Sequence, residues 1–181
     1  MNNHPVVTID LVLDRHTTKE VLRAVLHSIL FHRLFGIVKP QTYDVLDVTM
    51  PGVDDPEIKQ LIQDKVDAFW KAVDLRADKK GEITVTFTEK RARKSWFLTS
   101  EEEVPWEQWT IKAAIQQPTS ERERQKFNSD LASNLTETLR TILTHTSSER
   151  GRSRVPPITN NQGISPFPVK ITVIVGGIEV S

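Results

Sequence analysis

The sequence contains no cysteine, and this absence removes several kinds of chemistry from consideration. Without thiols there is no disulfide framework, no thiolate nucleophile and no cysteine-ligated zinc site. Glycine is also scarce, with seven residues scattered over 181 and one adjacent pair, Gly176-Gly177. A glycine-rich phosphate-binding loop is therefore excluded, and the glycine pair is typical of a hairpin turn.

Net charge and long apolar runs are missing as well. The 24 basic residues are balanced by 24 acidic ones, whereas a general polyanion-binding domain usually carries a positive excess. No apolar run approaches the roughly 20 residues that span a bilayer, and acidic residues interrupt the apolar start where a signal peptide would have none. These features predict a soluble intracellular protein.

Hydrophobic periodicity predicts three amphipathic helices. The first begins near Thr17 and stops near Gly36, the second begins at Asp55-Pro56, and the third begins at Thr119 or Ser120. Their expected buried faces comprise Val21, Leu22, Val25, Leu26, Ile29 and Leu30; Ile58, Leu61, Ile62, Val66, Phe69 and Val73; and Phe127, Leu131, Leu135, Leu139, Ile142 and Leu143.

Alternating apolar residues predict strands at 7–13, 43–49, 82–90, 106–115 and 169–180. Two loops are expected between these elements, one over residues 88–105 and a longer one, rich in Ser, Pro, Gly and Asn, over 147–166. Helices interspersed with antiparallel-type strands favour a single α+β domain, with an antiparallel-rich sheet and three main helices on one face.

No group of residues predicts catalysis, a metal site or a cofactor. His27 and His32 lie five positions apart on the first helix, so they do not share the face that a helical zinc site requires. Glu101, Glu102 and Glu103 are consecutive, and such carboxylates rarely converge on one cation, so a solvated acidic segment is favoured. We therefore predict that the protein is not an enzyme and has no small-molecule substrate.

An adjacent aromatic pair, Trp96-Phe97, stands between a basic run and the three glutamates. Because large aromatics are costly to leave in water, either this stretch folds back onto the core or the pair is displayed for a partner. The nearby strand predicts that Trp109, which alternates with Ile111 and Ala113, is core.

The basic run consists of Lys90, Arg91, Arg93 and Lys94. Basic residues beside an aromatic are typical of nucleic-acid-binding loops, and they also suit peripheral contact with an anionic membrane. The alternative is a charged rim around a hydrophobic protein contact. The acidic residues that follow and the neutral chain favour the rim.

The order of these predicted elements, together with several specific stretches, resembles the autophagy-related protein 101 family from end to end. The most specific are "AVLHSILFHR" and "VPWEQWTIK", followed in order by a helix beginning "TSERERQKF". The resemblance implies a non-enzymatic HORMA-fold subunit of the autophagy-initiation kinase complex. It implies a cytoplasmic protein recruited to the phagophore assembly site, which pairs with the HORMA domain of autophagy-related protein 13.

Within this resemblance, the family's exposed Trp and Phe finger, which recruits downstream factors, falls on Trp96 and Phe97. The family pattern places one residue between the two aromatics, whereas here they are adjacent. HORMA dimers commonly use the third helix, so Arg124 and Asn128 are interface candidates. The alternative function is a nucleic-acid- or chromosome-associated HORMA adaptor that uses the basic run.

The end of the chain differs from HORMA proteins that wrap a long C-terminal segment around a partner peptide. Six residues follow Val175, and they span roughly 20 Å when fully extended. This length is too short to encircle a peptide, so we expect an open-like state without a seat belt.

Overall fold

The computed structural model describes residues 3–159 and 163–181, and it confirms the α+β class. The helices are α1 (Thr18–Arg33), α2 (Pro56–Asp74), α3 (Glu121–Ser147) and the short α4 (Glu149–Ser153). The strands are β1 (Val6–Leu13), β2 (Pro40–Val45), β3 (Val48–Val53), β4 (Lys80–Lys94), β5 (Thr99–Ile115), β6 (Val169–Val175) and β7 (Ile178–Glu179).

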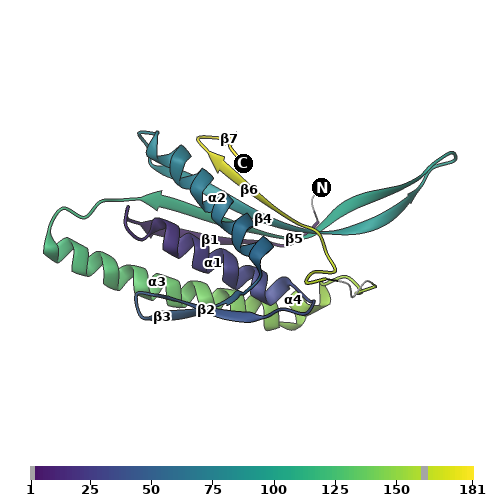
Figure 1. Cartoon of the computed structure of the whole chain (residues 1–181), viewed down its shortest axis with the longest axis horizontal. Helices are drawn as coiled ribbons and strands as arrows, with labels where there is room; N and C mark the ends of the chain where they lie inside the picture. Colours follow the sequence, from purple (N-terminus) through teal and green to yellow (C-terminus); the bar gives the residue numbers. More distant parts are fainter. Residues whose placement is uncertain (1–2, 160–162) are drawn as a thin grey trace.

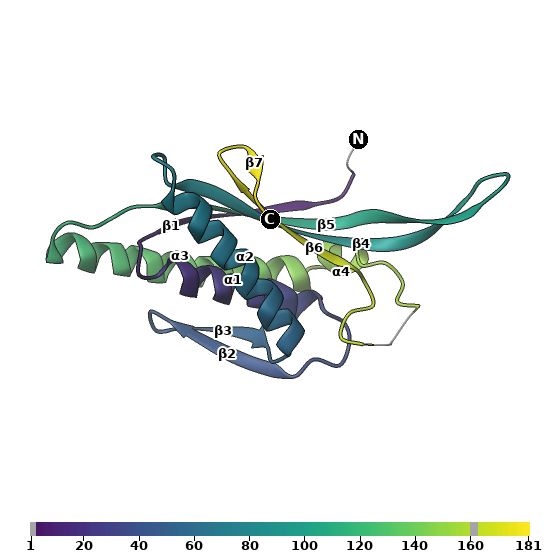
Figure 2. The same cartoon turned by 45° about the horizontal axis from the view of Figure 1, so that its top comes forward.

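The main sheet has the strand order β1-β5-β4-β6-β7 (Figure 1). β1 pairs parallel to β5, and the three other neighbouring pairs are antiparallel. The three main helices cover one face of this sheet, and the β2–β3 hairpin lies beyond α1 on the side away from the sheet (Figure 2). This arrangement is consistent with the HORMA fold that the resemblance implies.

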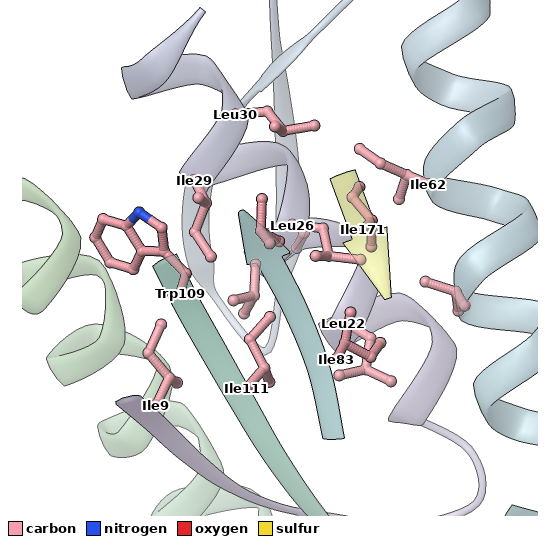
Figure 3. Packing of buried hydrophobic residues seen from close by; sticks show 14 of the residues in the cluster. Ile9, Leu22, Leu26, Ile29, Leu30, Ile62, Ile83, Trp109, Ile111 and Ile171 are labelled. Carbon is pink, nitrogen blue, oxygen red and sulfur yellow. The ribbon is translucent and has the colours of Figure 1, made fainter. Parts of the chain in front are cut away.

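The core lies between the sheet and the helices. In Figure 3, isoleucines from β1, β5, β4 and β6 meet Leu22, Leu26 and Ile29 of α1. All six residues of the predicted α1 face are buried, as are five of the six on α2. The predicted α3 face is wrong at Leu143, which is exposed, whereas Thr138 is buried in the same helix.

Two of the predicted helix starts are confirmed by their capping bonds. The side chain of Asp55 accepts a hydrogen bond from the backbone of Ile58 at 3.0 Å, and Ser120 accepts one from Glu123 at 3.2 Å. The start of α1 differs, because the Thr17 side chain makes no capping bond to the helix. Asp14 instead accepts hydrogen bonds from both the backbone and the hydroxyl of Thr17.

The predicted strand at 43–49 is instead a two-stranded hairpin, β2–β3. Its turn consists of Leu46 and Asp47, which both adopt positive φ, at 47° and 63°. Such turns usually contain Asn-Gly or Asp-Gly, so the sequence carries no conventional signal for this one. Leu46 packs against the core, and that contact compensates for its unfavourable backbone.

The predicted loop over 147–166 is partly helical. α3 extends to Ser147, and α4 follows, with the Ser148 side chain accepting a hydrogen bond from Gly151 at 2.9 Å. One serine of this segment, Ser148, therefore caps a helix, a role for which serine is well suited. Residues 160–162 of this predicted loop lie outside the described residues.

The last described residues form the short hairpin that the glycine pair predicts. Gly176 and Gly177 form the predicted turn, and both have positive φ. The backbone of Val173 then exchanges hydrogen bonds with Val180 and Ser181, each at 2.8 Å. These last residues are therefore paired with β6 at that edge of the sheet.

His27 attaches the β2–β3 hairpin to α1 from a buried position. Its Nδ1 accepts a hydrogen bond from the backbone of Val53 at 3.2 Å, and its Nε2 lies 3.1 Å from the Tyr43 hydroxyl. Burial lowers the pKa of His27 to about 4, and the nearby positive charges of Lys59 and Arg23 add to the effect. The ring is therefore neutral, with Nδ1 unprotonated.

This geometry predicts a specific loss of stability in mild acid. The folded pKa of His27 lies below its ordinary value of 6.5, so the unfolded chain takes up a proton that the folded chain excludes as the pH falls from 6.5 towards 4. The free energy of unfolding should fall by about 1.4 kcal/mol per pH unit in that window from this group. His27→Asn keeps an acceptor for Val53 but does not titrate, so urea unfolding of this variant between pH 7 and 5 should show a flatter slope. Equal slopes for both proteins would contradict the assignment.

Candidate partner-recruiting site

The β4–β5 hairpin extends far beyond the rest of the sheet (Figure 1). β6 accompanies β4 only as far as Phe87, and β1 accompanies β5 only from Gln108. Residues 88–105, here called the ribbon, thus form an isolated two-stranded segment. The sequence predicted a loop here, but strand pairing continues to the Lys94–Thr99 pair.

The distal end of the ribbon displays three large apolar side chains. Trp96 is 97% exposed, Phe97 is 92% exposed and Leu98 is 74% exposed. These residues, here called the tip, follow Ser95, whose hydroxyl donates to the Leu98 carbonyl at 3.0 Å and accepts from the Leu98 amide at 3.2 Å. The tip is therefore held in a closed turn, and Leu98 is a member that the sequence prediction missed.

The four predicted rim residues all lie on the ribbon and are exposed. Their strand register sets them against acidic or polar partners on β5. Lys90 is opposite Glu103, and Arg91 is opposite Glu102. Four basic residues on the ribbon are balanced by four acidic ones, so the ribbon carries no net charge.

A β-bulge marks the base of the ribbon. Phe87 and Thr88 are opposite Glu107 and Pro105, which leaves Trp106 as the extra residue of β5. Trp106 is buried, with its ring centroid 5.6 Å from that of Phe87. The guanidinium of Arg33 lies 5.6 Å from the Trp106 ring centroid. Bulges redirect a strand and increase its twist, and this one lies where the hairpin leaves the sheet.

Glu107, next to the bulge, is fully buried and accepts four hydrogen bonds. Two come from Arg33 of α1, both at 2.7 Å; the others come from His145 of α3 at 2.6 Å and from the Trp109 indole at 2.8 Å. Arg33 also donates to the Gly151 carbonyl of α4 at 3.1 Å. The carboxylate thus joins the base of the ribbon to α1, α3 and α4.

The electrostatics of this cluster follow from its contacts. Burial alone would raise the pKa of Glu107, but the hydrogen bonds from His145, Arg33 and Trp109 outweigh it and lower the pKa below its usual value. Sequence reasoning missed Glu107, although a signal was present. It occupies an inward position in the same alternation as Trp109 and Ile111, where a carboxylate requires partners.

The described residues contain no cluster of three metal-ligating side chains. His27 is bonded as above, and His32 Nδ1 lies 2.7 Å from the Ser28 carbonyl. In the same part of the chain, no helix has the length and apolar character needed to cross a membrane.

The family model described as autophagy-related protein 101 matches residues 10–162, which include the whole ribbon and the Glu107 cluster. The chain belongs to this family. An Arabidopsis thaliana protein named autophagy-related protein 101 is 30% identical over 91% of this chain and 84% of its own length. Proteins of the same name from Schizosaccharomyces pombe and Homo sapiens are 36% and 29% identical. The matches cover 60% and 65% of this chain, and about three fifths of each relative.

Both ends of α3 in this member of the autophagy-related protein 101 family have exposed residues that suit a protein partner. The predicted interface residues Arg124 and Asn128 lie in the first half of α3 and are partly exposed. At the other end of α3, a groove between α1, α3 and α4 is lined by the exposed apolar side chains Phe35, Leu143 and Ile158. The groove is bordered by Arg33 of the Glu107 cluster.

Proposed function

We propose that this chain is a non-catalytic scaffold subunit of the autophagy-initiation complex, and that its tip recruits downstream factors. The observation that carries this proposal is the display of Trp96 and Phe97, almost fully exposed, at the end of a β-ribbon. Exposed aromatic clusters mark protein contacts, and a few such residues supply most of the binding energy in an interface.

The base of the ribbon supports the same proposal. An isolated hairpin is only marginally stable in water, so its direction depends on where its strands enter the sheet. Here Trp106 and Glu107 fix the base to the core through aromatic packing and four charge-assisted or indole hydrogen bonds. The tip is thereby held away from the body of the protein, where a receptor can reach it.

The scaffold role extends to a second surface. We propose that the chain pairs with the HORMA domain of autophagy-related protein 13, stabilises it, and is recruited with it from the cytoplasm to the phagophore assembly site. The third helix carries this interface. Because Leu143, Phe35 and Ile158 are exposed, the groove at the end of α3 is a stronger candidate for its centre than Arg124 and Asn128.

The buried cluster around Glu107 at the base of the ribbon also supports a non-catalytic role. A carboxylate offers about four lone-pair positions, and Glu107 already accepts four hydrogen bonds. It is also fully buried, so it has neither a free acceptor position nor access to a substrate. The cluster is therefore suited to holding β5 against the helices and not to acting on a substrate.

The test of the recruiting role is the variant Trp96→Ala/Phe97→Ala. Because both side chains are exposed, the free energy of unfolding should change by no more than about 0.5 kcal/mol. The variant should still co-purify with the HORMA domain of autophagy-related protein 13 and should lose autophagic flux in cells that lack the endogenous protein.

Leu143→Asp provides the matched control, because it should lose the HORMA partner while leaving the tip intact. Thermal melting and co-expression separate the two effects. A double alanine variant that unfolds, or one that is stable and supports normal flux, would refute the recruiting role.

A further inference from the structure

The ribbon separates its charges by strand. Its exposed basic residues all lie on β4, and its three exposed acidic residues all lie on β5. The basic row consists of Lys90, Arg91, Arg93 and Lys94, and the acidic row consists of Glu101, Glu102 and Glu103. Both rows lie directly behind the tip, one on each strand of the ribbon.

The two rows are adjacent but are not joined by ion pairs. Residues directly opposite on antiparallel strands have Cβ atoms about 5 Å apart, close enough for opposite charges to bridge. Among the described residues, none of the ion pairs links the basic row to the acidic row. Arg91 instead pairs with Glu89 on its own strand. Because side chains alternate between the two faces of a ribbon, each face carries basic groups over β4 and acidic groups over β5.

We propose that the receptor of the tip is a protein pocket with an apolar centre and two oppositely charged flanks, acidic beside β4 and basic beside β5. This inference rests on the proposed recruiting role and adds the chemistry of the receptor. Complementary charge patterns determine orientation and exclude wrong partners, because like charges brought together cost several kcal/mol. A ribbon docked in the reverse orientation would meet like charges along both edges.

The same separation disfavours polyanions as ligands of the tip. A nucleic acid or an anionic bilayer attracts the basic row, but it repels Glu101, Glu102 and Glu103 at the other edge. The ribbon is only two strands wide, so neither row can approach a uniformly negative surface without the other. A surface with charges of both signs fits both rows at once.

The decisive variant inverts every charge of the ribbon. Net charge stays at zero, and each opposite-charge pair keeps its partner with the signs exchanged, so strand pairing is preserved. The substitutions are Glu89→Lys, Lys90→Glu, Arg91→Glu, Arg93→Glu, Lys94→Glu, Glu101→Lys, Glu102→Arg and Glu103→Lys. The control exchanges an exposed ion pair between α1 and α2, away from the ribbon and from α3, as Lys19→Asp/Asp67→Lys.

Receptor affinity should fall about tenfold or more in the inverted ribbon, because both flanks then meet like charges. Autophagic flux in cells that lack the endogenous protein should therefore fall to the level of Trp96→Ala/Phe97→Ala, while the Lys19→Asp/Asp67→Lys exchange supports normal flux. Normal flux from a folded inverted ribbon overturns the proposal. Normal flux from the double alanine variant overturns the recruiting role itself, so the two failures are distinguishable.

A second variant distinguishes a receptor with a basic flank from a polyanion. It changes fewer residues than the inverted ribbon and is therefore less able to disturb folding. Glu101→Gln/Glu102→Gln/Glu103→Gln removes the acidic row without reversing any charge. Recruitment of the downstream factors that wild-type protein captures through its tip should weaken about threefold or more, because a basic flank loses its partners. If the tip binds nucleic acid or anionic vesicles, the same variant should bind duplex DNA or phosphatidylserine vesicles more tightly than wild type, and this result would overturn the proposal.

Discussion

Glu107→Gln should lower the free energy of unfolding by about 3–5 kcal/mol, the usual cost of removing one partner from a buried ion pair. The substitution keeps the shape of the side chain but leaves the Arg33 guanidinium buried without a counter-charge. The glutamine NH₂ group would also face donors, because all four bonds to Glu107 come from N–H groups. Urea unfolding of the purified chain measures the change.

The control for this prediction is Glu103→Gln on the exposed ribbon, which should change stability by no more than about 0.5 kcal/mol. A double variant, Arg33→Met/Glu107→Leu, should be more stable than Glu107→Gln because it leaves no unpaired charge in the core. A loss of less than about 1 kcal/mol in Glu107→Gln would show that the cluster contributes little to the fold.

Trp109→Ala should cost about 3–5 kcal/mol, as large aromatic truncations in cores do. Trp109 is fully buried and belongs to the cluster of β1, β5 and α1 side chains shown in Figure 3. It also donates its indole N–H to Glu107 and meets the His145 ring edge-on, with centroids 5.2 Å apart. Chemical denaturation compared with Trp96→Ala gives the contrast between a buried and an exposed tryptophan.

Trp109→Phe separates the two contributions of this side chain. Phenylalanine keeps most of the ring volume but cannot donate to Glu107, so its loss of stability should lie between those of wild type and Trp109→Ala. If Trp109→Ala unfolds at the same urea concentration as wild type, the assignment of Trp109 to the core is wrong.

Much of the fold follows from periodicity. Apolar residues alternate along β1 and repeat at helical spacing along α1. Their burial could therefore be assigned directly from the sequence. The starts of α2 and α3 could be predicted as directly, because Asp55 and Ser120 have a side-chain oxygen at the spacing that the free backbone amides require.

The features that sequence reasoning missed depend on contacts between distant residues. The Leu46-Asp47 turn has unfavourable residues for positive φ, and its stability comes from packing against the core. The ribbon continues as strand because its two halves pair with each other, and a polar, charged segment gives no apolar alternation to indicate this. Arg33 and Glu107 are 74 positions apart, so only the fold brings them together.

The candidate site was predicted in part. The polar setting of Trp96 and Phe97 left core packing and display as alternatives, the resemblance favoured display, and both side chains are exposed at the tip. The sequence separated the basic run from the three glutamates but did not show that they lie side by side, because that depends on the register that sets Lys90 opposite Glu103. The two blocks of charge are separated along the chain by the tip, and strand pairing makes them neighbours.

The parallel pairing of β1 with β5 has a consequence for the order in which the chain can assemble. Val6 pairs with Gln108 and Leu13 with Ile115, so the first strand to leave the ribosome waits for a partner about 100 residues later. Closing a loop of that length costs about 4 kcal/mol in chain entropy. The α1 and α2 segments are complete before the central strands exist, and the backbone of β1 cannot complete its pairing with β5 until translation has passed residue 115.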